Sequence, residues 1–136
     1  RNLAVMSELK TPIIVVVTGE GGSGGALAIS VGDHLSMLQY ATYSVASPEA
    51  CSSIIWRTPD KASEAADAMK VCSHELLKIN IIDEIISEPL GGAHRDYDEV
   101  SLQIKHSLIQ NLAKLSQLSS EDLVDRRYKR LLQIGI

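Results

Sequence analysis

The chain has 136 residues, of which 45% are hydrophobic and 22% charged, and its formal net charge is −4. This size and composition predict one soluble globular domain with a modest core. The acidic balance argues against a general nucleic-acid binder, and the longest apolar run, residues 13–17, is too short to cross a membrane. Cys51 and Cys72 have neither metal-site spacing nor the density of a disulfide scaffold, which favours a reducing compartment.

The first third of the chain alternates predicted helices and strands. Helices are predicted over residues 1–10 and 23–31, and strands over residues 13–17, 34–39 and 41–46. The β-branched run at 13–17 is apolar at every position, so we expect a strand that is covered on both faces and lies deep in the core. The chain begins with an Arg inside a helical pattern and without an initiator Met, which leads us to expect a piece of a longer polypeptide.

Helices dominate the middle of the chain. Ser47 followed by Pro48 and Glu49 predicts a capped helix that runs to about Trp56. Further helices are predicted over residues 61–70, with a narrow apolar side, and 73–78. A strand over residues 81–86 and a second glycine loop over 88–95 follow.

Beyond residue 95 the pattern becomes purely helical. Asp96 and Glu99 form a capping box, and the helix that they start carries an apolar stripe that must be covered, at Val100, Ile104, Leu108, Leu112 and Leu115. A last helix opens at Ser119. Its basic cluster, residues 126–130, predicts a solvated or interface face, or less often a contact to an acidic partner or a phosphate.

A glycine-rich turn joins the first strand to the second helix. Its glycines are Gly19, Gly21, Gly22, Gly24 and Gly25. Glycine permits positive φ and close approach of a ligand, and the first N–H groups of a helix have no intrahelical acceptor. The N–H groups of Gly24 and Gly25 are therefore candidates to bind an anion or a developing oxyanion.

Other interpretations of this turn remain open. Gly19, Gly21 and Gly24 fit the dinucleotide pattern G-x-G-x-x-G, although the ribose-binding acid is missing. The G-x-S-x-G pattern centred on Ser23 fits a hydrolase elbow, with Asp83 and His94 following in the right order. The turn could also serve only to pack the helix closely on the strand.

Four stretches resemble the α subunit of the acetyl-coenzyme A carboxylase carboxyltransferase. They are GEGGSGGALAI (residues 19–29), MLQYATYSVASPEAC (37–51), IIDEIISEPLGGAH (81–94) and SSEDLVDRRYKRL (119–131). Together they span nearly the whole chain in order, and they match the C-terminal part of that subunit. The chain departs from the family at Ser30 and Ala50, where glycine is common, and neither position touches the turn.

The resemblance implies an α/β fold of the crotonase/ClpP-like ββα spiral type, incomplete here, with C-terminal helices. Residues 1–95 would form the C-terminal half of the core and residues 96–136 a helical extension of the same domain. Gly24 and Gly25 would supply the backbone oxyanion hole, and Gly21, Gly22 and Ser23 would bind substrate.

The implied activity is transfer of a carboxyl group from carboxybiotin, carried on a biotin carboxyl carrier protein, to acetyl-coenzyme A. The product is malonyl-coenzyme A for fatty-acid synthesis. The implied partner is a β subunit that carries the zinc site, in an α2β2 assembly in the bacterial cytoplasm or the plastid stroma, with no metal in this chain. The alternatives are another crotonase-fold acyl-coenzyme A hydratase, isomerase or decarboxylase, or a noncatalytic scaffold.

Overall fold

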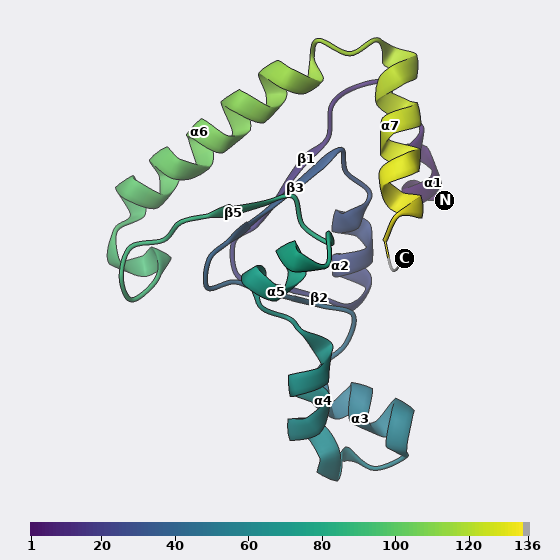
Figure 1. Cartoon of the computed structure of the whole chain (residues 1–136), viewed down its shortest axis with the longest axis vertical. Helices are drawn as coiled ribbons and strands as arrows, with labels where there is room; N and C mark the ends of the chain where they lie inside the picture. Colours follow the sequence, from purple (N-terminus) through teal and green to yellow (C-terminus); the bar gives the residue numbers. More distant parts are fainter. Residues whose placement is uncertain (135–136) are drawn as a thin grey trace.

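Three parallel strands form the main sheet of this computed structural model, which describes residues 1–134 (Figure 1). They are β1 (Ile14–Val17), β3 (His34–Leu38) and β5 (Glu84–Ile86), in the spatial order β1-β3-β5. Val15 pairs with Leu35, and Met37 pairs with Ile85. The helical connections between these strands suit a parallel sheet, because parallel neighbours need long crossovers.

The centre of the core is β3, and not the strand at 13–17 as the sequence predicted. Leu35, Met37 and Leu38 are at most 1% exposed, whereas Ile14, Val15 and Val16 are only half-buried. Within the described residues, β1 pairs with β3 on one side alone. A strand with one hydrogen-bonded neighbour cannot be enclosed as fully as a central one, which explains the difference.

A second, two-stranded parallel sheet joins the glycine turn to the following strand. It pairs β2 (Glu20–Gly22) with β4 (Thr42–Ser44), and Gly21 lies opposite Tyr43. The sequence predicted only a turn at this place. Extended backbone forms there because Thr42 N–H donates to the Gly19 carbonyl at 2.9 Å and so starts the ladder.

The α-helices follow the predicted order with shorter ends. They are α1 (Asn2–Ser7), α2 (Ser23–Ser30), α3 (Pro48–Trp56), α4 (Ala62–Met69), α5 (Ser73–Lys78), α6 (Tyr97–Leu115) and α7 (Ser120–Leu132), with short 3-10 turns η1 (Pro59–Lys61) and η2 (Ala93–Arg95). The caps predicted at Ser47 and Asp96 are confirmed, since their side chains accept from Ala50 N and Glu99 N. No helix of the described residues is long and apolar enough to span a bilayer.

The helices cover the sheet unevenly. In Figure 1, α6 runs along the side of β5, α7 stands beside α1, and α3 with α4 forms a hairpin that projects away from the strands. The expected partial exposure of the helix at 61–70 is confirmed, because Ala65 is the one fully buried residue that the structure describes in α4. The division of the chain at residue 95 stays a proposal, although α6 begins close to it.

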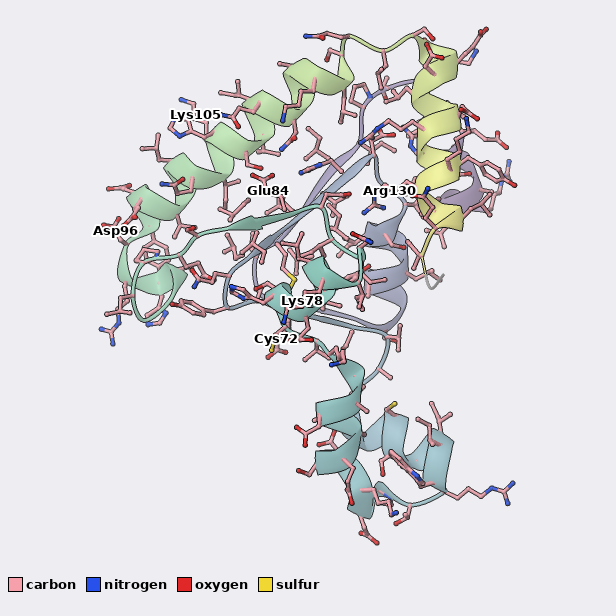
Figure 2. The ribbon with its side chains drawn as sticks, in the orientation of Figure 1. Cys72, Lys78, Glu84, Asp96, Lys105 and Arg130 are labelled. Atoms are coloured by element: carbon pink, nitrogen blue, oxygen red, sulfur yellow. The ribbon has the colours of Figure 1, made fainter. Side chains whose placement is uncertain are left out.

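Two expectations about the C-terminal helices hold only in part. The face of α6 that is buried carries Ser107 and Asn111 besides Val100 and Leu115, while Leu112 is 49% exposed. The polar residues turn inward because both donate to the Glu84 carboxylate on β5, at 2.6 and 2.9 Å, and Figure 2 shows Glu84 between β5 and α6.

The solvated face predicted for the basic cluster at 126–130 is present only in part, because Arg126, Tyr128 and Lys129 are exposed while Arg127 and Arg130 are held by carboxylates of other segments. Arg127 is fully buried and forms an ion pair with the equally buried Asp33 at 2.8 Å. Arg126 donates to the Asp33 carbonyl at 2.8 Å, and Arg130 pairs with Asp83 at 2.8 Å. The carboxylates of Asp33 and Asp83 explain the difference, because they draw the cations of Arg127 and Arg130 toward the sheet.

Candidate oxyanion site

The glycine turn delivers the N-terminus of α2 to the surface of the sheet. Gly22 is the N-cap in extended conformation, with φ −141° and ψ 155°, and no described side chain caps the helix. The N–H groups of Gly24 and Gly25 donate to no atom of the described residues. Two donors at the positive end of a helix dipole are therefore free to bind an oxygen with negative charge.

The glycines of the turn have different reasons to be glycine. A Cβ on Gly21 would lie 2.8 Å from Cδ2 of Tyr43, so the ring requires glycine there. A Cβ on Gly22, Gly24 or Gly25 would meet no atom within 4 Å. Packing within the described chain therefore does not explain glycine at 24 and 25, whereas close approach of a ligand would.

An apolar cavity of about 650 Å³ opens beside this turn. Its lining residues are Ser23, Gly24, Ala26, Leu27, Ser30, Tyr43, Ser44, Val45, Met69, Leu76, Ile79, Ile81 and Ile134. The only polar side chains among them are hydroxyls, and no carboxylate of the described residues takes part. The cavity has the size and character of a pocket for a small organic group.

Tyr43 is the site residue that the sequence analysis did not single out. It is 8% exposed, and its hydroxyl donates to the Ala26 carbonyl of α2 at 2.5 Å. Burial raises the pKa of the Tyr43 phenol, against smaller lowering effects of the Ser30 hydroxyl and the Arg130 charge. The alternation of residues 41–46, which places Tyr43 and Val45 on one side of the strand, was the available signal.

The hydrolase interpretation lacks its base in this arrangement. Ser23 does have a left-handed backbone, with φ 52°, as a strained elbow would. However, the Asp83 carboxylate accepts from Leu35 N–H at 2.7 Å and from Arg130. Among the described residues, no histidine is hydrogen-bonded to Ser23 or to Asp83. The structure therefore does not bring Ser23, Asp83 and His94 together as a triad.

The dinucleotide interpretation finds little support in the same region. Gly21 belongs to β2 and Gly19 precedes it, so of the three pattern glycines only Gly24 reaches the helix N-terminus. Within the part of the chain that the structure describes, no group of His, Cys, Asp and Glu has the geometry to hold a metal ion.

The parallel strands, the glycine turn and the helix with free N–H groups belong to a crotonase-like α/β fold, which is the class of the protein. A solved structure supports this class. It is an enoyl-CoA hydratase/isomerase from Pseudoalteromonas atlantica, with a TM-score of 0.55 and 20% identity, and the match covers 96% of this chain and 51% of that one. The predicted fold class is thereby confirmed.

The family follows from sequence comparison. Residues 1–135 match the family described as "Acetyl co-enzyme A carboxylase carboxyltransferase-like", and the chain belongs to it. A relative from Photorhabdus laumondii, named acetyl-coenzyme A carboxylase carboxyl transferase subunit alpha, is 56% identical to this chain. The match covers 99% of this chain and 42% of the relative. A relative of the same name from Vibrio campbellii is 58% identical, over 98% of this chain and 42% of the relative. The chain thus spans less than half the length of these relatives.

Proposed function

We propose that this chain is part of a carboxyltransferase α subunit that moves a carboxyl group from carboxybiotin to acetyl-coenzyme A, forming malonyl-coenzyme A. The observation that carries the proposal is the pair of free N–H groups of Gly24 and Gly25 beside an apolar cavity. Membership of the family supports it. The same membership motivates the proposed partners, which are a zinc-containing β subunit in an α2β2 assembly and a biotin carboxyl carrier protein.

The residues of the turn fit a biotin group. Carboxybiotin, when bound, would supply the carboxyl group: its N–C bond breaks and its ureido oxygen gains negative charge. The biotin nitrogen would then take the proton that the acetyl methyl group gives up as the new C–C bond forms. The N–H groups of Gly24 and Gly25 hold the ureido oxygen, since fixed donors stabilise charge without reorganising. Gly22 leaves room for the ring, Ser23 lines the cavity, and Gly21 supports the turn by admitting Tyr43.

The alternatives make different demands on this site. A hydratase or isomerase needs a general acid or base at the substrate, and a carboxylate would be the usual choice. The described residues that line the cavity provide only hydroxyls. A noncatalytic scaffold would need neither the free donors nor the open space at Gly24 and Gly25.

The variant Gly25→Pro tests the proposal in the full-length subunit reconstituted with its β subunit. Proline deletes one N–H donor and is tolerated in the first turn of a helix, and its Cβ has free space. We expect turnover to fall by about a hundred- to a thousandfold, as for other oxyanion donors, with assembly retained. Malonyl-coenzyme A formation measures turnover, and size-exclusion chromatography measures assembly.

Gly25→Ala is the matched control, because it adds a Cβ and keeps the N–H. In a helix, Ala is more stable than Gly by roughly 0.5–1 kcal/mol, and no neighbour lies within 4 Å of the new Cβ. We expect its activity to stay well above that of Gly25→Pro. A proline variant that assembles and turns over within about threefold of the wild type would disprove the role of this donor.

A further inference from the structure

Tyr43 contacts both ends of the segment that carries the two free N–H groups. Its ring lies against Gly21, where a Cβ would come within 2.8 Å of Cδ2, and Gly21 is also its partner across the β2–β4 ladder. Its hydroxyl donates to the Ala26 carbonyl at 2.5 Å. Residues 22–25 are thus held between two contacts of a single side chain.

Helix α2 has few other anchors. Of its described residues only Ala26 is fully buried, Ile29 is half-buried against the core, no described side chain caps the helix, and Leu27 is 60% exposed. Ser23 stands at φ 52°, outside the helical region, so the backbone changes direction just before the donors. A short helix with so little buried surface depends on individual contacts for its orientation.

Tyr43 itself is firmly placed. Its backbone N–H donates to the Val71 carbonyl at 3.0 Å, and its side chain belongs to the hydrophobic core together with Val17 and Leu76. Burial raises the pKa of its phenol, so the hydroxyl keeps its proton at neutral pH and remains a donor. The contact to Ala26 therefore connects a rigid part of the core to a weakly anchored helix.

We propose that Tyr43 is a positioning residue for carboxyl transfer, which aims the N–H groups of Gly24 and Gly25 by fixing the turn at Gly21 and at Ala26. This inference rests on the proposed function of the site. Stabilisation of an oxyanion requires donors that are already aligned, and small misplacements in an active site cost large factors in rate. Loss of the contact should therefore lower turnover more than it lowers affinity or stability.

The test is Tyr43→Phe in the full-length subunit assembled with its β subunit. This variant keeps the ring against Gly21 and removes only the bond to Ala26. We expect kcat to fall roughly ten- to a hundredfold, with the KM for acetyl-coenzyme A and the elution volume of the complex unchanged. Tyr40→Phe is the matched control, because Tyr40 is 52% exposed and its hydroxyl has no partner among the described residues; it should retain wild-type kcat.

A second variant approaches the same contact from the other side. Gly21→Ala should push the ring away and so break the hydrogen bond from the Tyr43 hydroxyl to Ala26. It should lower kcat similarly and add little when combined with Tyr43→Phe, because both variants lose that hydrogen bond. The positioning role is wrong if Tyr43→Phe turns over within about twofold of the wild type. Where Tyr43→Phe does not assemble, the same result for Gly21→Ala would disprove it. A wild-type complex that forms no malonyl-coenzyme A would instead overturn the proposed function itself.

Discussion

Arg127 shows how one residue connects distant parts of the chain. Its guanidinium forms two hydrogen bonds with the Asp33 carboxylate, at 2.8 and 2.9 Å. It also donates to backbone carbonyls of the segment after α1, including Leu9 at 2.8 Å and Thr11 at 3.0 Å. Asp33 in turn accepts from Ile13 N–H at 2.7 Å. The pair therefore joins α7, the entry to β1 and the entry to β3.

Removal of one partner from this pair should be costly. Arg127→Met would leave the Asp33 carboxylate buried and without its cation, and such changes cost about 3–5 kcal/mol. We expect the free energy of unfolding to fall by that amount in urea titrations of the full-length subunit. Lys129→Met, at an exposed position of the same helix, should change little. An equal loss of stability in Arg127→Met and Lys129→Met would contradict this role of the Arg127–Asp33 ion pair.

Nothing near Arg127 in the sequence indicates this role. Arg126, Arg127 and Arg130 were predicted to form a solvated or interface face because local patterns show only their charges. Their partners, Asp33 and Asp83, lie 94 and 47 residues away in the chain. By contrast, the oxyanion donors were predicted, since a glycine turn before a helix is a local signal. Their use in catalysis stays a prediction.

At the scale of elements, local sequence signals predicted where the helices lie in the chain but not which side of each helix is buried. The caps of α3 and α6 depend on residues within one turn, and both were predicted. The buried side of α6 depends on Glu84 of β5, which accepts from Ser107 and Asn111 across 23 and 27 residues of sequence. The position of β1 at the edge likewise depends on which strands surround it, and periodicity does not report this.

The contact of α6 with the sheet should depend on pH. Burial alone would raise the pKa of Glu84, but hydrogen bonds from Ser107, His34 and Ser36 outweigh it and hold that pKa below its ordinary value of 4.5. A carboxyl group with a lowered pKa in the folded state stabilises the fold above its unfolded pKa. This stabilisation is lost as the pH falls through the folded pKa.

We therefore expect Glu84→Gln to flatten the acid limb of the stability curve. Wild-type protein should lose stability below about pH 4.5 more steeply than the variant, because protonation of Glu84 weakens its acceptor oxygens. Urea titrations between about pH 3 and pH 7 would measure the difference. Glu64→Gln, at an exposed position of α4, is the control. Parallel acid limbs for wild type and Glu84→Gln would contradict this coupling.

At the scale of the whole molecule, the hairpin of α3 and α4 projects away from the strands (Figure 1), and large apolar side chains are exposed on α3 and just before it. Ile54 is 76% exposed, Ile55 60% and Trp56 38%, and Val45, which precedes the hairpin, is 79% exposed. Contiguous exposed apolar surface usually marks a contact with another protein. Since the chain spans less than half of its relatives' length, we expect the remainder of the full-length subunit or the proposed β partner to cover this surface.

Trp56 can report whether the hairpin is covered, because it is the only Trp of the chain. Alone, the chain should bind a hydrophobic dye, and the double variant Ile54→Glu, Ile55→Glu should bind less, since it places charge on the apolar face. Leu90→Glu, which changes an isolated residue that is 94% exposed, should bind nearly as much dye as the wild type.

When the chain is mixed with the β subunit, we expect the Trp56 emission to shift to shorter wavelength and the double variant to bind that subunit more weakly. An emission spectrum that stays constant while the complex forms would contradict coverage of the hairpin by the β subunit.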